Sequence, residues 1–441
     1  MALAALPGVR ARRMVWLLGL AACSEAASSG LGGLGGGPSD MGRAVEDLGF
    51  EPDLGRISDL GVGDTGAGPD AGPMRDCPLP EPRFVETAYL PNVVPDFVLQ
   101  GDRLWVAVDD PNMPMQRRVS IADGSMSARL DGTVVMASAE GVALAIRRLD
   151  DGSSIFERQV EESITSFGPF RDVRLPGVNP LDPSPLRRAR PVDGERAVLS
   201  MSSGRELLIL EGPRAQRIGA PPGVVFDEPW VGGGDIVWTS LLPQGPQLVR
   251  WTLPSVAEGR DLDPDAFQVR GVSAGTELVW LEDGALWAAD SNDGIRLARG
   301  PCGELSSDGE RALAVCRDAE DTVLLSRLEG RTETLARLGE GGVITNPDAD
   351  GDWIGWMEYE DPTAFFEPSP FPSGRVRLLH LPTGRQAEAP VGSGCYICGA
   401  IWPAPHLQLE AGHAAWNYAR EDDRPVGMPV AALRLPDCPD R

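Results

Sequence analysis

A pair of cysteines, Cys395 and Cys398, in the run CYIC has a spacing that could do chemistry. This spacing occurs in thiol redox sites, in half of a zinc site and in tight structural disulfides. A redox site needs a helix N-terminus to stabilise the thiolate, but the flanking runs VGSG and GAIW indicate a turn and a strand. A zinc site needs four ligands, and His406 and His413 are at the wrong spacing for a known finger. We therefore interpret Cys395 and Cys398 as a structural disulfide, with a redox or metal site as the alternatives.

The three histidines offer no catalytic pattern. His380 lies inside a strand-like run, His413 lies in a turn, and the sequence contains no H-E-x-x-H motif and no phosphate-binding loop. We expect these histidines to be structural, and we assign no catalytic residue and no metal ligand.

The acidic run Asp348–Asp352 resembles the start of a calcium loop. Its carboxylates alternate, but Gly351 stands at the fourth place of the loop instead of the sixth. Tyr359 occupies the twelfth place, where a bidentate Glu is needed. We interpret the carboxylates as turn formers and predict no cofactor, with Ca²⁺ as the alternative.

The N-terminus has the pattern of an export signal. Arg10, Arg12 and Arg13 precede the apolar run 14–20, and small residues lead to a cysteine in Leu20-Ala21-Ala22-Cys23. This motif resembles the lipobox of bacterial lipoproteins. The resemblance implies that residues 1–22 are a signal peptide and that Cys23 becomes a lipidated first residue. Several acyl chains give stable anchoring, whereas one is marginal. The alternative is an ordinary cleaved signal with an incidental cysteine.

The same resemblance suggests a location. Ser24 follows the lipidated cysteine, and the absence of Asp there resembles the pattern that sorts lipoproteins to the outer membrane. We expect a protein of the cell envelope, anchored to the outer membrane by lipid, on a side that the sequence leaves open.

Residues 23–76 have the composition of a flexible linker. Gly, Asp, Pro and Ser dominate this stretch, and Phe50 is its one aromatic residue. Such a segment buries too little apolar surface to offset its chain entropy. We predict a disordered spacer between the lipid anchor and a folded domain at 77–441.

The charge of the chain excludes one class of partner. The net charge is −25, and every basic residue is Arg, because the chain contains no lysine. An acidic surface argues against binding to a phosphate backbone, so we expect no nucleic-acid partner. It is compatible with a cation or a basic partner.

The remaining cysteines, once Cys23 is assigned to lipid, suggest disulfides in an exported chain. Cys302 and Cys316 are symmetric about Gly309, so a hairpin turning there would place them on neighbouring strands. Cys77 and Cys438 bracket the domain, where a closed ring must join its first and last strands. We predict the pairs Cys302–Cys316 and Cys77–Cys438 beside Cys395–Cys398.

A turn-plus-strand unit recurs along the domain. Its clearest copy is DGDWIGW at 350–356, in which a polar turn leads into a strand carrying Trp353 and Trp356. The glycines that open the copies are Gly101, Gly141, Gly194, Gly234, Gly275, Gly309, Gly351 and Gly412. Most intervals are close to the ~40–45 residues of a four-stranded blade. We predict an all-β fold, a β-propeller of eight blades, or of seven if the copy at Gly141 belongs to a neighbour.

Two of the copies carry a family resemblance. SSDGER at 306–311 and VDGER at 192–196 resemble the Ser-Pro-Asp-Gly-Lys-aromatic repeat of TolB-type and related WD40-like propellers. The resemblance extends over most of residues 95–430. In this chain the Ser-Pro is usually absent and the lysine is always replaced. The resemblance implies the propeller fold and leaves the partner open.

Three long connections have the composition of a binding surface. In a four-stranded blade, the loops between the second and third strands all open on one face of the ring. Three of these loops are long, and they belong to the first, seventh and eighth copies, which are neighbours in a closed ring. The candidate partner-binding residues lie in these loops and in the strand end that leads into the second loop. They are Asp109, Asp110, Met113, Met115, Glu358, Glu360, Asp361, Phe365, Phe366, Phe371, Glu421, Asp422, Asp423 and Met428. Long apolar loops on a rigid scaffold are typical of binding sites. The alternative is that the phenylalanines fold back under their own loop.

These patterns favour a lipid-anchored propeller that binds a protein or peptide partner in the envelope. The alternative function, from a different class, is a propeller enzyme that cleaves glycans in its central channel. That function needs two carboxylates ~5–10 Å apart in the channel.

Overall fold

Strands form the regular structure of the chain wherever the computed structural model describes it, from Pro78 to Cys438 with gaps. The larger gaps are 86–96, 109–114, 175–191, 360–373, 393–405 and 419–429, and shorter ones fall at other connections. All described residues belong to the unit Ala71–Arg441. The predicted signal peptide (1–22), Cys23 and the predicted linker (23–76) lie outside the described residues. Nowhere in the described part of the chain is there a helix long and apolar enough to cross a membrane.

The described strands form eight antiparallel sheets. The first contains β2 (Phe97–Gln100), β3 (Arg103–Val108), β4 (Met115–Ser120) and β5 (Met126–Asp131). The second contains β6 (Thr133–Ala137), β7 (Val142–Arg148), β8 (Ser154–Val160) and β9 (Ser163–Phe170). The third contains β10 (Val173–Arg174), β11 (Val192–Asp193), β12 (Arg196–Met201), β13 (Glu206–Glu211) and β14 (Arg214–Gly219). The fourth contains β15 (Val225–Gly232), β16 (Asp235–Leu242), β17 (Gly245–Thr252) and β18 (Glu258–Asp261).

The other four sheets follow the same plan. The fifth contains β19 (Val269–Ala274), β20 (Glu277–Glu282), β21 (Ala285–Ala289) and β22 (Ile295–Arg296). The sixth contains β23 (Cys302–Ser307), β24 (Ala312–Asp318), β25 (Asp321–Leu328) and β26 (Arg331–Leu338). The seventh contains β27 (Val343–Asp350), β28 (Trp353–Tyr359), β29 (Gly374–His380) and β30 (Arg385–Gly392). The last contains β31 (Leu407–Glu410), β32 (His413–Asn417), β33 (Val430–Arg434) and β1 (Arg83–Val85).

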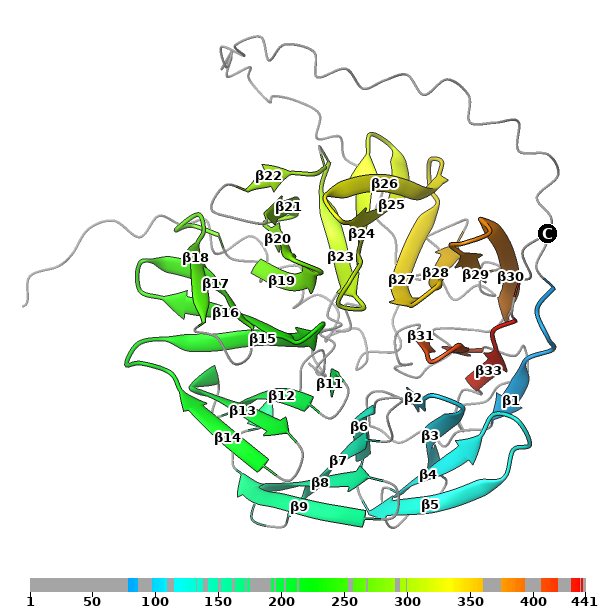
Figure 1. Cartoon of the computed structure of the whole chain (residues 1–441), viewed down its shortest axis with the longest axis horizontal. Helices are drawn as coiled ribbons and strands as arrows, with labels where there is room; N and C mark the ends of the chain where they lie inside the picture. Colours follow the sequence, from blue (N-terminus) through cyan, green and yellow to red (C-terminus); the bar gives the residue numbers. More distant parts are fainter. Residues whose placement is uncertain are drawn as a thin grey trace, which may run out of the picture. The chain divides into compact units, whose positions relative to one another are not determined.

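The sheets stand around a common centre, with the fourth strand of each towards the rim (Figure 1). This is the predicted all-β propeller architecture. The turn-plus-strand copies mark the hairpin between the first and second strands of the sheets. Gly101, Gly234, Gly275, Gly309, Gly351 and Gly412 all lie in such turns with positive φ, while Gly141 and Gly194 lie outside the described residues.

The ring is closed by strands from both ends of the described chain. β1 pairs with β33 in the order β1-β33-β32-β31, so the N-terminal strand completes the C-terminal sheet. β1 pairs only with Val430, Ala431 and Ala432. We refer to this sheet as the closing sheet.

Tryptophans fill the space between neighbouring sheets. Trp105, Trp230, Trp356 and Trp416 are almost completely buried, and Trp353 is 6% exposed. Trp353 packs in a core with Leu407, Leu409 and Trp416 of the closing sheet. The prediction that Trp353 and Trp356 belong to the core is confirmed. An aromatic side chain of this size buries about 150–250 Å² and is a major source of stability.

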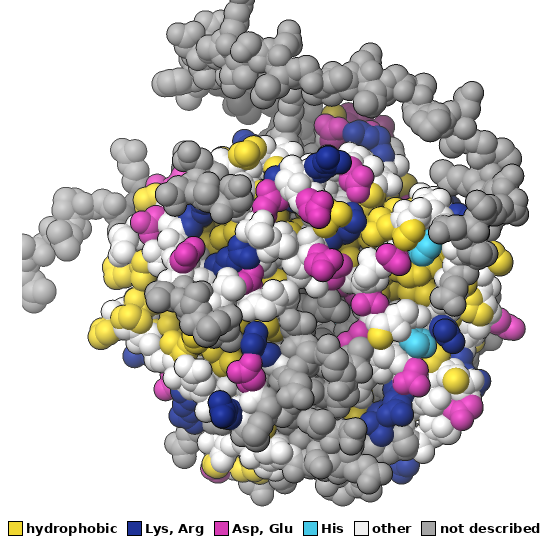
Figure 2. Space-filling model, viewed as in Figure 1, with side chains coloured by type: hydrophobic (Ala, Val, Ile, Leu, Met, Phe, Trp, Pro, Cys, Tyr) yellow, Lys and Arg dark blue, Asp and Glu magenta, His cyan; other side chains and the backbone are white. Residues whose placement is uncertain are grey.

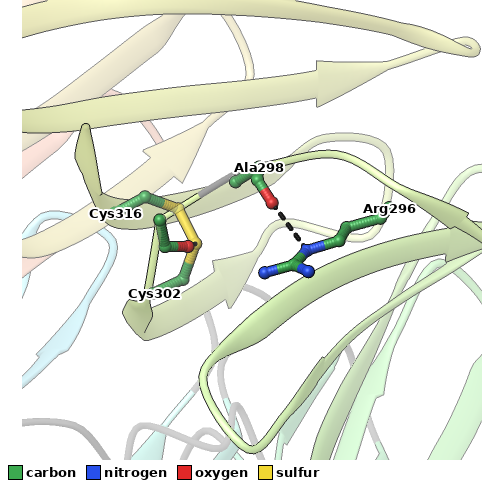
Figure 3. Close-up of a disulfide and its surroundings, with 5 residues drawn as sticks. Arg296, Ala298, Cys302 and Cys316 are labelled. Atoms are coloured by element: carbon green, nitrogen blue, oxygen red, sulfur yellow. Dashed lines mark hydrogen bonds between the residues drawn. A yellow bond between two sulfur atoms is a disulfide. The ribbon is translucent and has the colours of Figure 1, made fainter. Parts of the chain in front are cut away.

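A disulfide joins the first two strands of the sixth sheet. Cys302 and Cys316 are directly paired in the ladder of β23 and β24, with their Cα atoms 3.9 Å apart (Figure 3). The hairpin turns at Gly309, as the spacing predicted, because two residues symmetric about a turn face each other in an antiparallel pair. Cys438 is buried and disulfide-bonded. Its partner is outside the described residues, as are Cys77, Cys395 and Cys398, so the other two predicted pairs remain predictions.

Candidate functional site

The predicted binding loops join the second and third strands of three sheets. They connect β3 to β4, β28 to β29 and β32 to β33, and span residues 109–114, 360–373 and 418–429. The corresponding connections elsewhere are as short as Pro243–Gln244, Asp283–Gly284 and Ala319–Glu320. Most of the candidate residues lie outside the described part of the chain: Asp109, Asp110, Met113, Glu360, Asp361, Phe365, Phe366, Phe371, Glu421, Asp422, Asp423 and Met428.

The three sheets that carry these loops are neighbours. The innermost strands β27, β31 and β2 lie side by side, and side chains of one strand bind the backbone of the next. The connections 86–96, from β1 to β2, and 393–406, from β30 to β31, also belong to these sheets. A strand reverses direction at every step of an antiparallel sheet, so all five connections leave the same edge of the ring. We call this edge the loop face.

Side-chain hydrogen bonds hold the three sheets together. The Asp348 carboxylate accepts a hydrogen bond from the backbone nitrogen of Leu409 at 2.8 Å. The Gln408 amide oxygen accepts one from the backbone nitrogen of Leu99 at 2.7 Å. Asp350 and Glu410, at the ends of the same two strands, make the corresponding bonds to the next turn. The loop face therefore stands on a support in which neighbouring sheets are fixed to each other.

Glu358 has a different place from the one the sequence suggested. The sequence grouped it with the partner-binding residues, whereas the structure places it within β28 with 6% of its surface exposed. Its carboxylate accepts hydrogen bonds from Trp356 Nε1 at 2.9 Å, Arg375 Nε at 2.8 Å and Arg377 Nε at 3.0 Å. Burial acts to raise the pKa of Glu358, but the hydrogen bonds from Trp356, Arg375 and Arg377 outweigh it and hold the pKa below its ordinary value. Glu358 thus anchors both strands at the base of the 360–373 connection.

The sequence reasoning missed Arg375 and Arg377. They alternate with Val376 on β29, and this pattern puts both guanidinium groups on one side of the strand. The sequence signal for this pair of arginines was an acidic residue, Glu358, on the preceding strand. The close approach of Tyr359 and Gly374 also fixes this base, because a Cβ on Gly374 would lie 2.5 Å from the Tyr359 ring.

An aromatic pair lies at the start of another of the long connections. The ring of Tyr418 meets the ring of Phe84 edge-on, with their centroids 4.7 Å apart. Phe84 belongs to β1 and is 38% exposed. The pair joins the 418–429 connection to the outermost strand of the closing sheet. Met115, another predicted site residue, begins β4.

Four carboxylates of the innermost strands are bound within the protein. Glu304 of β23 is buried and accepts hydrogen bonds from the Thr345 hydroxyl and from the backbone nitrogen of Asn346. Asp348, Asp350 and Glu410 bind backbone nitrogens of the next sheet. In these roles they are structural, which differs from the solvent-facing pair that a glycan-cleaving channel needs. Among the described residues, no group of three or more His, Cys, Asp or Glu side chains is placed to hold a metal ion.

Comparison with known proteins finds a likeness among solved structures. No family model matches the chain, and no curated protein matches it. Among solved structures, the WD40 domain of SCAP from fission yeast is 11% identical, with a TM-score of 0.44, covering 80% of this chain and 98% of that one. BamB from Moraxella catarrhalis is 11% identical, with a TM-score of 0.43, covering 80% and 100%. A candidate TolB protein from Agrobacterium tumefaciens is 11% identical, with a TM-score of 0.31, covering 55% and 87%. The likeness concerns the chain fold and nothing more.

Proposed function

We propose that this protein is a lipid-anchored β-propeller of the bacterial envelope that binds a protein partner through its loop face. The observation that carries the proposal is the grouping of the long connections on three neighbouring sheets. Long loops held on a rigid scaffold are the usual form of a binding site. The loop face has such loops, whereas the corresponding connections elsewhere include short turns. The structure neighbours include WD40 and BamB propellers, and a scaffold role for this chain is in keeping with them.

The aromatic loop supplies the first test. Phe365, Phe366 and Phe371 are changed together to Ser in the full chain. A control chain carries Met126→Ser, Leu241→Ser and Ile295→Ser, which removes three apolar side chains that are exposed on other strands. Both proteins are cross-linked in envelope preparations, and the captured proteins are identified by mass spectrometry.

The loop variant should lose the proteins that the wild type and the control capture, with the same melting temperature as the wild type. Retention of those proteins by the loop variant would overturn the assignment of the site. A large drop in its melting temperature would instead assign the phenylalanines to the core, the alternative given above.

The anchor supplies a separate test. Lipidation through the thiol of Cys23 predicts that Cys23→Ser abolishes labelling by radioactive palmitate and moves the protein out of the membrane fraction. A chain with Ser24→Ala is the control, since it leaves the thiol in place. Labelling that persists in Cys23→Ser contradicts the anchor but leaves the loop face untouched. The hydrogen bonds of Glu304, Asp348, Asp350 and Glu410 within the protein give no support to the glycan-enzyme alternative.

A further inference from the structure

A groove of about 860 Å³ crosses the edge of the ring opposite to the loop face. We call it the seam groove. Its walls come from the seventh sheet, the closing sheet and the first sheet. They include the inner turns at Asp352, Gly412 and Asp102, and the ends of β1 and β33 around Glu81 and Arg434. Figure 2 shows histidine side chains with acidic and basic neighbours over these sheets.

The groove exists because the ring closes there. In the first and seventh sheets, the turns 121–125 and 381–384 join the third strand to the fourth. In the closing sheet the fourth strand, β1, comes from the other end of the chain, so no hairpin can fill this position. The ends of the two strands, Pro80–Arg83 and Leu433–Pro436, line the opening instead. β1 pairs with residues 430–432 of β33, so Leu433 and Arg434 lie beyond the paired part of that strand.

The groove presents mainly hydrogen-bond acceptors. The carboxylates of Glu81, Asp102 and Asp352 belong to exposed residues. His413 Nδ1 lies 3.0 Å from the carbonyl oxygen of Ala411, so this nitrogen donates a hydrogen bond to the backbone. His380 lines the groove although it is 91% buried; its Nδ1 is bonded to the Thr383 hydroxyl at 2.8 Å. Among the described residues we find no partner for its Nε2.

The basic side chains of the groove are fewer. Arg83 donates a hydrogen bond to the carbonyl oxygen of Ala122 at 2.7 Å, which holds its guanidinium against the wall. Arg434 is exposed. The lining therefore has an excess of negative charge, and the whole chain carries a net charge of −25. A field of this sign attracts cations and repels anions.

We propose that the seam groove binds an extended basic segment of a partner protein. The carboxylates of Asp352 and Asp102 stand on inner turns of the seventh and first sheets, on either side of the closing sheet. This spacing matches a chain with spaced cationic side chains better than a single small cation. The volume lies within the ~300–1,000 Å³ of known ligand sites. This site is separate from the loop face, and it does not require the function proposed for that face.

The test uses a defined probe and the full chain. The probe is a capped eight-residue peptide that alternates Gly and Lys; a peptide with Glu in place of Lys and free spermidine are the comparisons. Binding is measured by calorimetry at low salt. A carbodiimide then couples the peptide amines to nearby carboxylates. Because the chain has no lysine, its own side chains supply no competing amine.

The variant Asp102→Asn with Asp352→Asn removes two exposed charges from the groove. The control, Glu310→Gln with Glu329→Gln, removes two exposed charges from the same edge of the sixth sheet. We expect one binding site, cross-links at Glu81, Asp102 or Asp352, and about fivefold weaker binding in the groove variant alone. The Phe365, Phe366 and Phe371 variant should bind the peptide normally.

Three results would overturn the proposal. Equal weakening in both charge variants would mean attraction by net charge without a site. Cross-links spread over carboxylates of other sheets would mean the same. Spermidine binding as tightly as the lysine peptide would assign the groove to a free polyamine instead of a protein segment.

Discussion

The Asp350 carboxylate accepts a hydrogen bond from the backbone nitrogen of Gly412, in the first turn of the neighbouring sheet, at 3.1 Å. Glu410 makes the corresponding bond to the backbone nitrogen of Gly101, at 3.2 Å. Adjacent sheets of the ring share no strand ladder here, so these side chains replace the backbone bonds that join strands within a sheet. The same device occurs on two successive sheets, including the one that closes the ring.

Asp350→Ala should lower the free energy of unfolding by about 1–2 kcal/mol, because it leaves the Gly412 nitrogen without its charged acceptor. Urea unfolding followed by tryptophan fluorescence measures the change. Asp352→Ala, two residues away on an exposed turn, is the control and should change stability by less than about 0.5 kcal/mol. Equal losses in the two variants would mean that the bond to Gly412 contributes nothing particular.

The same contacts bear on calcium. Asp348 and Asp350 bind the backbone nitrogens of Leu409 and Gly412, and a metal would have to compete with those bonds. We predict that the melting temperature is the same after dialysis against a chelator as it is in millimolar calcium. A rise of several degrees with calcium, absent in Asp350→Ala, would contradict this and restore the metal alternative.

Local patterns were readable from the sequence, and contacts between distant residues were not. The turn at Gly309 and the facing pair Cys302 and Cys316 follow from a hairpin of a few residues, so spacing alone predicts them. The sequence assigned Asp350 to a turn, whereas it is the last residue of β27, and its partner Gly412 lies 62 residues away in another sheet. Rules about residues close together in the sequence cannot predict a contact between residues so far apart.

Glu358 illustrates the same limit in the candidate site. An acidic residue beside a long acidic loop reads as exposed, yet Arg375 and Arg377, 17 and 19 residues later, bury its charge. The seam groove could not be predicted from the sequence either, because it is formed at the ends of β1 and β33, which meet only when the ring closes.

A third prediction concerns close contact between turns. Gly309 has a φ of +101°, and a Cβ there would lie 2.5 Å from the backbone nitrogen of Gly233. Gly309→Ala should cost about 2–4 kcal/mol, from the backbone conformation and from overpacking together. Gly351→Ala is the control, since φ is +55° and nothing lies within 4 Å of its Cβ. It should cost about 1–2 kcal/mol. Similar losses at both sites would show that the turns can separate without cost.

The disulfide gives a fourth prediction. Cys302 and Cys316 are 14 residues apart, and a cross-link of this length stabilises by about 3 kcal/mol in the chain-entropy model. Changing both to Ala should lower the free energy of unfolding by about 2–4 kcal/mol in guanidinium. Peptide mapping without reductant should show the pair linked in the wild type. An unchanged midpoint would mean that the packing of the two buried side chains, and not the covalent bond, holds this hairpin.

The buried charge of Glu358 predicts a dependence on pH. Its pKa is lower in the folded protein than in the unfolded chain, so the unfolded state binds more protons in acid. The stabilisation is complete above the ordinary pKa of a glutamate and is lost as pH falls through the lower folded value. Glu358→Gln should therefore cost about 1–3 kcal/mol at neutral pH, and the difference from the wild type should shrink as the pH falls below about 4. Urea unfolding at a series of pH values measures the difference, with Glu360→Gln, two residues further along the chain, as the control. A difference that stays constant down to acid pH would show that shape and hydrogen bonding, without the charge, hold the base of the loop.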